Sequence, residues 1–141
     1  MSQIPAASFK TRYFEDYCVG EVAEFGDYHI TSEEIIDFAK RYDPQLFHTD
    51  PEAAKQSSFG GLVASGWMSA GVLMRLLVEH YVSPVASMGS PGVDELSWHN
   101  PVKPGDRLHA RVEVVGKRRS QRNLPPRIAG GRSESREITL E

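Results

Sequence analysis

The feature that most limits the fold is the segment SGWMSAGVLMRLLVEHYVS, residues 65–83, which is the longest helical candidate in the chain. Apolar residues occupy most of its faces: Trp67, Met68, Val72, Leu73, Leu76, Leu77, Val78 and Tyr81. A helix that is apolar nearly all round is typical of a buried helix. The rest of the chain must therefore supply elements that wrap around residues 65–83.

The sequence offers several strands for this purpose. Residues 20–31 read as extended, and residues 93–119 resemble two strands joined by the turn sequence KPGD. In the second of these two, Leu108, Ala110, Val112 and Val114 alternate with polar residues. RSESREITLE, residues 132–141, indicates a further strand. One central helix wrapped by antiparallel strands is an α+β arrangement.

The length, charge and cysteine content predict a single-domain cytoplasmic protein that binds no nucleic acid and spans no membrane. A chain of 141 residues is expected to form one domain over 1–141, and its net charge of −3 favours no nucleic-acid partner. The longest apolar tract, GVLMRLLV, is interrupted by Arg75 and is too short to span a bilayer. The single cysteine, Cys18, and an N-terminus without a signal-peptide core predict a cytoplasmic protein. No cofactor is predicted.

A second helix is predicted to end at a carboxylate. In TSEEIIDFAKRYDP, residues 31–44, Thr31 and Glu34 have capping-box spacing, and Pro44 should end the helix at Asp43. Because the helix dipole disfavours a negative charge at a C-terminus, local stability gives Asp43 little reason to be there. A new helix should follow, with Asp50 as its N-cap and a proline at its first position.

The break at residue 44 allows Asp43 and His48 to converge, whereas five positions on a continuous helix would separate them. Together, a carboxylate and an imidazole can hold a water molecule and move its protons. On spacing alone, the commoner alternative is an aspartate that satisfies a turn and an exposed histidine. A metal site of Asp43, His48 and Asp50 would bind weakly and unselectively, so no metal is predicted.

The start of the long helix is a second candidate site. In GGLVASGWM, residues 60–68, Ser65 is a suitable N-cap, and Gly66 would let a ligand approach the free N–H groups. The alternative is that the glycines only permit tight turns and close packing. The basic run GKRRSQR, residues 116–122, could bind a phosphorylated ligand tail, although a solvated loop is the favoured interpretation.

These motifs together resemble the MaoC-like dehydratases, the family that includes the R-specific enoyl-CoA hydratases. The resemblance runs from about residue 14 to residue 116 and rests on YDPQLFHTDPEAA, FGGLVASGWM and SWHNPVKPGDRLHARVEVV in that order. It implies a hot-dog fold, in which an antiparallel sheet wraps around one long helix, and an enzyme that is a homodimer or higher homo-oligomer. It also implies a last strand, which we expect to be missing from this chain.

The resemblance implies roles for four residues. Asp43 and His48 match the catalytic pair that adds water to a 2-enoyl thioester, without deciding which of them is the base. Gly66, preceded by Ser65, matches the substrate-binding glycine whose N–H polarises the thioester carbonyl. The implied substrate is an acyl-CoA or an acyl-carrier thioester of fatty acid metabolism, and the implied product is the 3-hydroxyacyl thioester.

Three positions depart from the family pattern. Gln45 and Leu46 stand where asparagine and proline are usual, with a proline earlier, at residue 44, and Met74 occupies a position that is often serine. Two alternatives therefore stay open: a hot-dog thioesterase and a non-catalytic subunit that binds acyl thioesters. The thioesterase is disfavoured because the first acid along the long helix is Glu79, far from its start.

Overall fold

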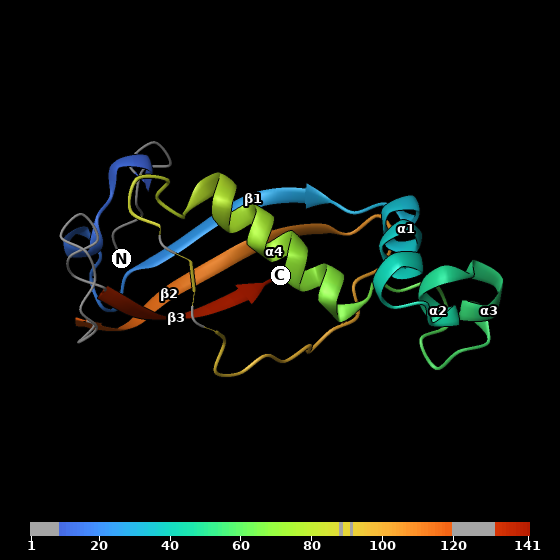
Figure 1. The fold of residues 1–141 in the computed structure, drawn as a ribbon. Helices are drawn as coiled ribbons and strands as arrows, with labels where there is room; N and C mark the ends of the chain where they lie inside the picture. The colour runs from blue at the N-terminus through green and yellow to red at the C-terminus, as the bar shows by residue number, and fades with distance from the viewer. Residues whose placement is uncertain (1–8, 88, 91, 120–131) are drawn as a thin grey trace.

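Three antiparallel strands form one sheet, and a long helix lies across one of its faces (Figure 1). The structure is a computed structural model that describes residues 9–87, 89, 90, 92–119 and 132–141. The strands are β1 (Val22–His29), β2 (Arg107–Arg119) and β3 (Arg132–Leu140), and β2 lies between the other two. The helices are the 3₁₀ turns η1 (Phe9–Thr11) and η2 (Phe14–Asp16), α1 (Ser32–Tyr42), α2 (Leu46–Thr49), α3 (Pro51–Lys55) and the long helix α4 (Gly66–His80).

The core lies between α4 and the sheet, as the α+β prediction requires. Val72, Leu76 and Leu77 of α4 are buried, and they face the apolar side of β2. The predicted alternation in β2 is confirmed, because Leu108, Ala110, Val112 and Val114 are all buried while the residues between them are partly exposed. Burying such side chains is the main favourable term in folding.

A glycine in β1 lets α4 approach the sheet closely. Gly26 has a φ of +90°, and a Cβ built on it would lie 2.7 Å from a methyl carbon of Leu76. The pairing of β1 with β2 is irregular at this point, between Phe25 and Tyr28. The backbone conformation and the space at this position therefore both favour glycine.

One predicted strand does not form. Residues 93–106 precede β2 without any strand pairing, and in this segment Val93, Leu96 and Trp98 are exposed. A strand needs a neighbour for its N–H and C=O groups. Within the described residues neither edge strand, β1 or β3, pairs with this segment. By contrast, the strand predicted at 132–141 is confirmed as β3.

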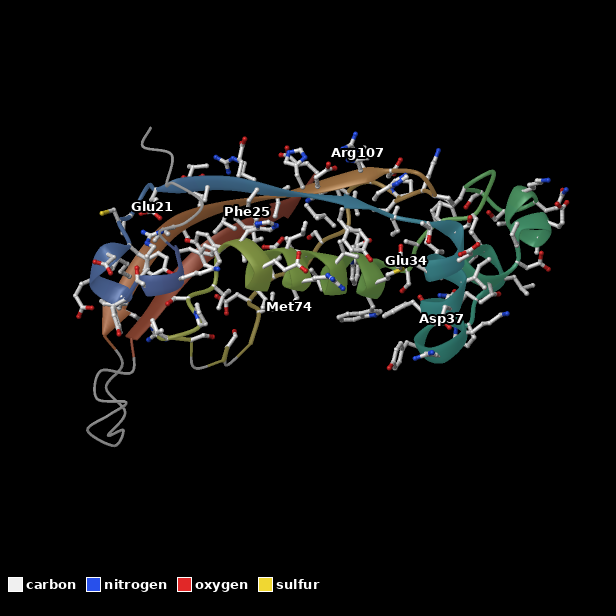
Figure 2. All side chains as sticks on the ribbon, turned by 90° about the horizontal axis from the view of Figure 1, so that it is seen from above. Glu21, Phe25, Glu34, Asp37, Met74 and Arg107 are labelled. Carbon is white, nitrogen blue, oxygen red and sulfur yellow. The ribbon has the colours of Figure 1, made fainter. Side chains whose placement is uncertain are left out.

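The prediction that α4 is buried on most faces is wrong for one face. Trp67, Met74 and Val78 are 61%, 54% and 57% exposed. Figure 2 shows Met74 on the side of α4 away from the sheet and Phe25 on the side toward it. The reason is geometric, because a single sheet covers only one side of the helix it packs on. The chain therefore presents an apolar stripe of Trp67, Met74 and Val78.

Candidate active site

Figure 1 shows α1, α2 and the start of α4 close together, at the end of the sheet where β2 begins. Residues at the end of α1, in α2 and at the start of α4 line a pocket. Local sequence signals determine the end of α1. Thr31 and Glu34 form the predicted capping box, and α1 ends at Tyr42 with Asp43 as its C-cap, as Pro44 predicted. The carboxylate of Asp43 is thus placed at the end of α1, where the helix is interrupted, rather than on a helix face.

A one-turn helix, α2, carries the histidine, and the sequence analysis did not predict it. Gln45 is its N-cap and His48 lies in its single turn. Four residues are too few to show a 3.6-residue periodicity, so the only signal was the break after Asp43. The next helix does begin as predicted, because Asp50 caps α3 and accepts hydrogen bonds from the N–H groups of Glu52 and Ala53.

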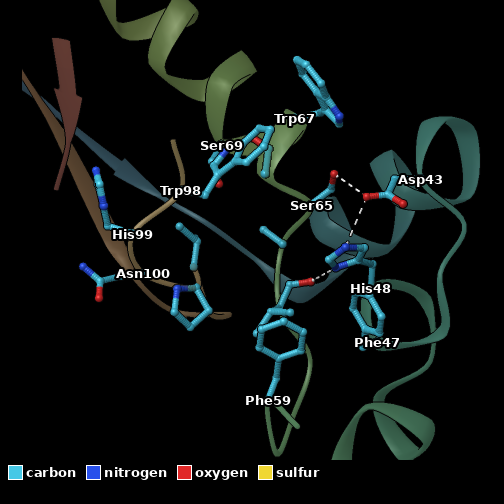
Figure 3. Close-up of a pocket in the computed structure, with 15 residues that line it drawn as sticks. Asp43, Phe47, His48, Phe59, Ser65, Trp67, Ser69, Trp98, His99 and Asn100 are labelled. Carbon is cyan, nitrogen blue, oxygen red and sulfur yellow. Dashed lines mark hydrogen bonds and ion pairs between the residues drawn. The ribbon is translucent and has the colours of Figure 1, made fainter. Parts of the chain in front are cut away.

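The structure brings Asp43 and His48 together. Their Oδ2 and Nε2 atoms lie 3.2 Å apart (Figure 3). His48 is only 6% exposed, so the alternative of an exposed histidine is wrong. The other ring nitrogen, Nδ1, lies 2.6 Å from the carbonyl oxygen of Val63. Because a carbonyl can only accept, Nδ1 carries a proton, and Nε2 is the nitrogen that can gain or lose one.

Two further side chains hold the carboxylate of Asp43. The Gln45 amide donates to Oδ1 at 2.7 Å, and the Ser65 hydroxyl donates to Oδ2 at 2.7 Å. The hydrogen bond from Gln45 is the largest effect that lowers the pKa of Asp43, and the bond from Ser65 and the charge of His48 add to it against an opposing effect of burial. Asp43 is therefore ionised at neutral pH.

Ser65 is the N-cap residue of α4, but its side chain does not cap the helix. Its hydroxyl reaches instead to a carboxylate 22 residues away in sequence. The first N–H group that bonds within α4 is that of Ser69, to the carbonyl of Ser65. The amides of Gly66, Trp67 and Met68 have no partner inside the helix, because an α-helix leaves its first N–H groups unused.

A tryptophan from the unpaired segment 93–106 packs on the start of α4. The indole nitrogen of Trp98 donates to the carbonyl of Gly66 at 2.8 Å. A Cβ at position 66 would lie 2.4 Å from the ring of Trp98, so this contact requires glycine. Trp67 packs edge-on against the same ring at 5.3 Å between centroids. The packing role that the sequence analysis considered for Gly66 is therefore real.

These residues line a pocket of about 410 Å³ (Figure 3). Its walls are Asp43, Phe47, His48, Phe59, Val63, Ala64, Ser65, Gly66, Trp67, Ser69, Trp98, His99, Asn100, Pro101 and Val102. All four residues predicted for the site are among them. The aromatic walls could not be predicted from the sequence, because Phe47, Phe59 and Trp98 come from three separate segments.

Two other candidates lie outside the pocket. Glu79 is near the opposite end of α4, where it pairs with Arg75. Lys117, in the basic run, donates to the carbonyl oxygen of Tyr17. Residues 120–122 of that run lie outside the described residues. In the part of the chain that the structure describes, no three metal-binding side chains gather, and no helix is long and apolar enough to cross a membrane.

Comparison with known proteins identifies the family. Residues 17–127 match the model of the MaoC-like domain. The chain is 36% identical over 89 residues to the 3-hydroxyacyl-thioester dehydratase Z of Mycobacterium tuberculosis, covering 62% of this chain and 59% of that protein. The crystal structure of the MaoC-like dehydratase from Rhodospirillum rubrum is similar, with a TM-score of 0.74 and 34% identity over 92% of this chain and 95% of that one.

An (R)-hydratase from A. caviae is also similar, with a TM-score of 0.56 and 26% identity over 74% of this chain and 76% of that one. The chain therefore belongs to the MaoC-like domain family, which includes hydratases and dehydratases. The hot-dog fold that the sequence resemblance implied is confirmed.

Proposed function

We propose that this protein is a hydratase/dehydratase that adds water reversibly to a 2-enoyl-CoA and forms a 3-hydroxyacyl-CoA. The observation that carries the proposal is the Asp43–His48 pair, which faces a largely apolar pocket beside the free N–H groups of α4. The family includes enzymes of this reaction class, and the named relatives act on 3-hydroxyacyl thioesters or are (R)-hydratases. An acyl-carrier thioester would present the same reacting atoms.

The pair suits the proton transfers of the reaction. Because Nδ1 donates to Val63, Nε2 of His48 is the nitrogen that can take a proton from a water molecule, and the ionised Asp43, whose Oδ2 lies 3.2 Å from Nε2, stabilises the imidazolium that forms. As the water oxygen bonds to C3 of the enoyl group, the electron pair of the double bond moves toward C2 and the thioester oxygen. Asp43 and His48 then return one proton to C2, so that one water molecule is added across the double bond in total.

The start of α4 suits the charge that develops on the thioester oxygen. The amide of Gly66 lies next to Ser65, whose hydroxyl contacts Asp43, so the donor and the acid–base pair border the same pocket. N–H groups at a helix N-terminus stabilise a developing oxyanion, and removal of one such donor costs about 10²–10³-fold in rate in other enzymes. Among the described residues no comparable arrangement supports the thioesterase, because Asp43 is the only acid of this set that lines the pocket and Glu79 is exposed at the other end of α4.

The test follows the absorbance of the conjugated thioester when crotonyl-CoA and its longer homologues are mixed with the protein. Loss of that absorbance with formation of 3-hydroxyacyl-CoA is the expected result. Release of free thiol would replace the proposal with the thioesterase. Tight binding without turnover, for every chain length, would replace it with an acyl-thioester-binding subunit.

We also propose that the protein is a homodimer or higher homo-oligomer that covers the apolar stripe of Trp67, Met74 and Val78 with a second copy. All three side chains are more than half exposed and lie on one face of α4. Contiguous exposed apolar surface of this kind is typical of an interface.

Met74→Lys is expected to weaken this assembly about tenfold or more, because burying an unpaired ammonium costs at least the 1.4 kcal/mol that a tenfold change represents. Light scattering across a dilution series measures the mass. Val19→Lys is the matched control, since Val19 is equally exposed but lies far from α4 in sequence and is expected to leave the mass unchanged. A wild-type protein that is monomeric at all concentrations would refute the proposal.

A further inference from the structure

We propose that Gln45 is a positioning residue for the reaction: it holds the carboxylate of Asp43 in the orientation that faces His48. The inference rests on the proposed function for its effect on turnover. Gln45 does not line the pocket, so it acts through Asp43 and not through the substrate. It stands at one of the positions where the sequence departs from the family pattern that the resemblance implies.

Gln45 links the two members of the pair. Its side-chain amide donates to Oδ1 of Asp43 at 2.7 Å, and its backbone N–H donates to the carbonyl oxygen of the same residue at 2.8 Å. Its own carbonyl accepts the backbone N–H of His48 at 2.9 Å. One residue thus contacts the carboxylate directly and begins the helical turn that carries the imidazole.

The hydrogen bond from the Gln45 amide restricts rotation of the Asp43 carboxylate about its Cβ–Cγ bond. Rotation of a carboxylate about its Cβ–Cγ bond is broad, because this torsion joins an sp³ to an sp² atom. Ser65 and His48 both contact Oδ2, and Gln45 alone among the described side chains holds Oδ1. With both oxygens held, Oδ2 stays directed at Nε2 of His48. Without Gln45, the carboxylate could turn within its polar surroundings.

Among the described residues, few charged groups other than His48 lie near enough to Asp43 to influence the orientation or the pKa of its carboxylate. His48 on α2 is the ionisable group in contact with Asp43, and His99 lines the same pocket. The first turn of α4 contains no charged residue. At the end of α1, Lys40 and Arg41 are exposed, and Arg41 pairs with Asp37. The hydrogen bond from Gln45 is the largest of the effects that lower the pKa of Asp43.

The experiment compares Gln45→Leu, which keeps a similar volume but has no donor, with Gln45→Glu, which replaces the donor with a negative charge. Because the bond favours the ionised form, its loss raises the pKa of Asp43. The titration midpoint of the Asp43 carboxyl should therefore move to higher pH in Gln45→Leu. A larger shift is expected in Gln45→Glu. At neutral pH, kcat should fall about tenfold while KM stays nearly constant.

Gln56→Leu is the matched control, because Gln56 is an exposed glutamine that ends α3 and has no carboxylate partner among the described side chains. A readout independent of activity is the ¹³C titration of the Asp43 carboxyl, assigned by its loss in Asp43→Asn. Its midpoint should rise in Gln45→Leu and stay unchanged in Gln56→Leu.

The outcomes separate this inference from the proposed function. An unchanged midpoint together with an unchanged kcat would overturn the role of Gln45, even in an active hydratase. A raised midpoint in a protein that hydrates no thioester would refute the proposed function and leave the orienting contact of Gln45 supported. A fall in kcat with an unchanged midpoint would indicate that Gln45 acts only through the stability of α2, which would also overturn the inference.

Discussion

Asp43→Asn and His48→Asn are each expected to lower turnover about 10²–10⁴-fold, the contribution typical of a general acid–base group. The first removes the charge that stabilises an imidazolium at His48. The second removes Nε2, while an asparagine amide can still donate toward the carbonyl of Val63 and so retain part of the buried contact. Steady-state rates with an enoyl thioester measure the effect, and thermal unfolding shows whether each variant is folded.

The control for this prediction is Asp50→Asn. It makes the same chemical change seven residues away, at a carboxylate that caps α3 and does not line the pocket. Asparagine is as good an N-cap as aspartate, so both stability and turnover should change little. The assignment of the pair would be wrong if either site variant kept most of the wild-type turnover.

Gly66→Ala is expected to destabilise the protein by about 1–3 kcal/mol, the usual cost of overpacking, and to reduce turnover as well. The added methyl group would lie 2.4 Å from the ring of Trp98. The ring would have to move and would lose its hydrogen bond to the carbonyl of residue 66. Chemical denaturation measures the stability, and hydration of an enoyl thioester measures the rate.

Two further variants separate packing from catalysis at this glycine. Gly71→Ala lies on the same helix with no atom within 4 Å of the added carbon, so it should stabilise the protein by about 0.5–1 kcal/mol. In a Trp98→Ala background, Gly66→Ala no longer meets the ring, and the two stability effects should be strongly non-additive. Any loss of rate that Gly66→Ala still causes in that background is attributed to a disturbed contact between the N–H of residue 66 and the thioester oxygen, and not to the clash with Trp98. Additive stability effects would refute the role assigned to Trp98.

The parts of the fold that sequence predicts well are those decided within a few residues. The capping box of Thr31 and Glu34, the helix end before Pro44 and the N-cap at Asp50 all depend on neighbours one to three positions away. The alternation in β2 is equally local. The strand expected near residue 98 fails because a strand depends on a partner elsewhere in the sheet, which local pattern does not report.

In the candidate site, too, the features that depend on near neighbours in sequence could be predicted, and those that depend on distant residues could not. That Asp43 and His48 can converge follows from a break between them, but the burial of His48 depends on Val63, 15 residues further along the chain. The contact from Ser65 to Asp43 spans 22 residues, and the one from Trp98 to Gly66 spans 32. No periodicity encodes such pairs. Gln45 lies only two residues from Asp43, yet its hydrogen bond becomes visible only with the side-chain geometry.

The contact between Trp67 and Trp98 has an optical consequence. These are the only two tryptophans in the chain, and both line the pocket. Intrinsic fluorescence excited at the indole band therefore reports on this one location, without a background from indoles elsewhere. A thioester that enters the pocket would change the emission of both rings, so that affinity could be measured on the unlabelled protein even for compounds that do not react.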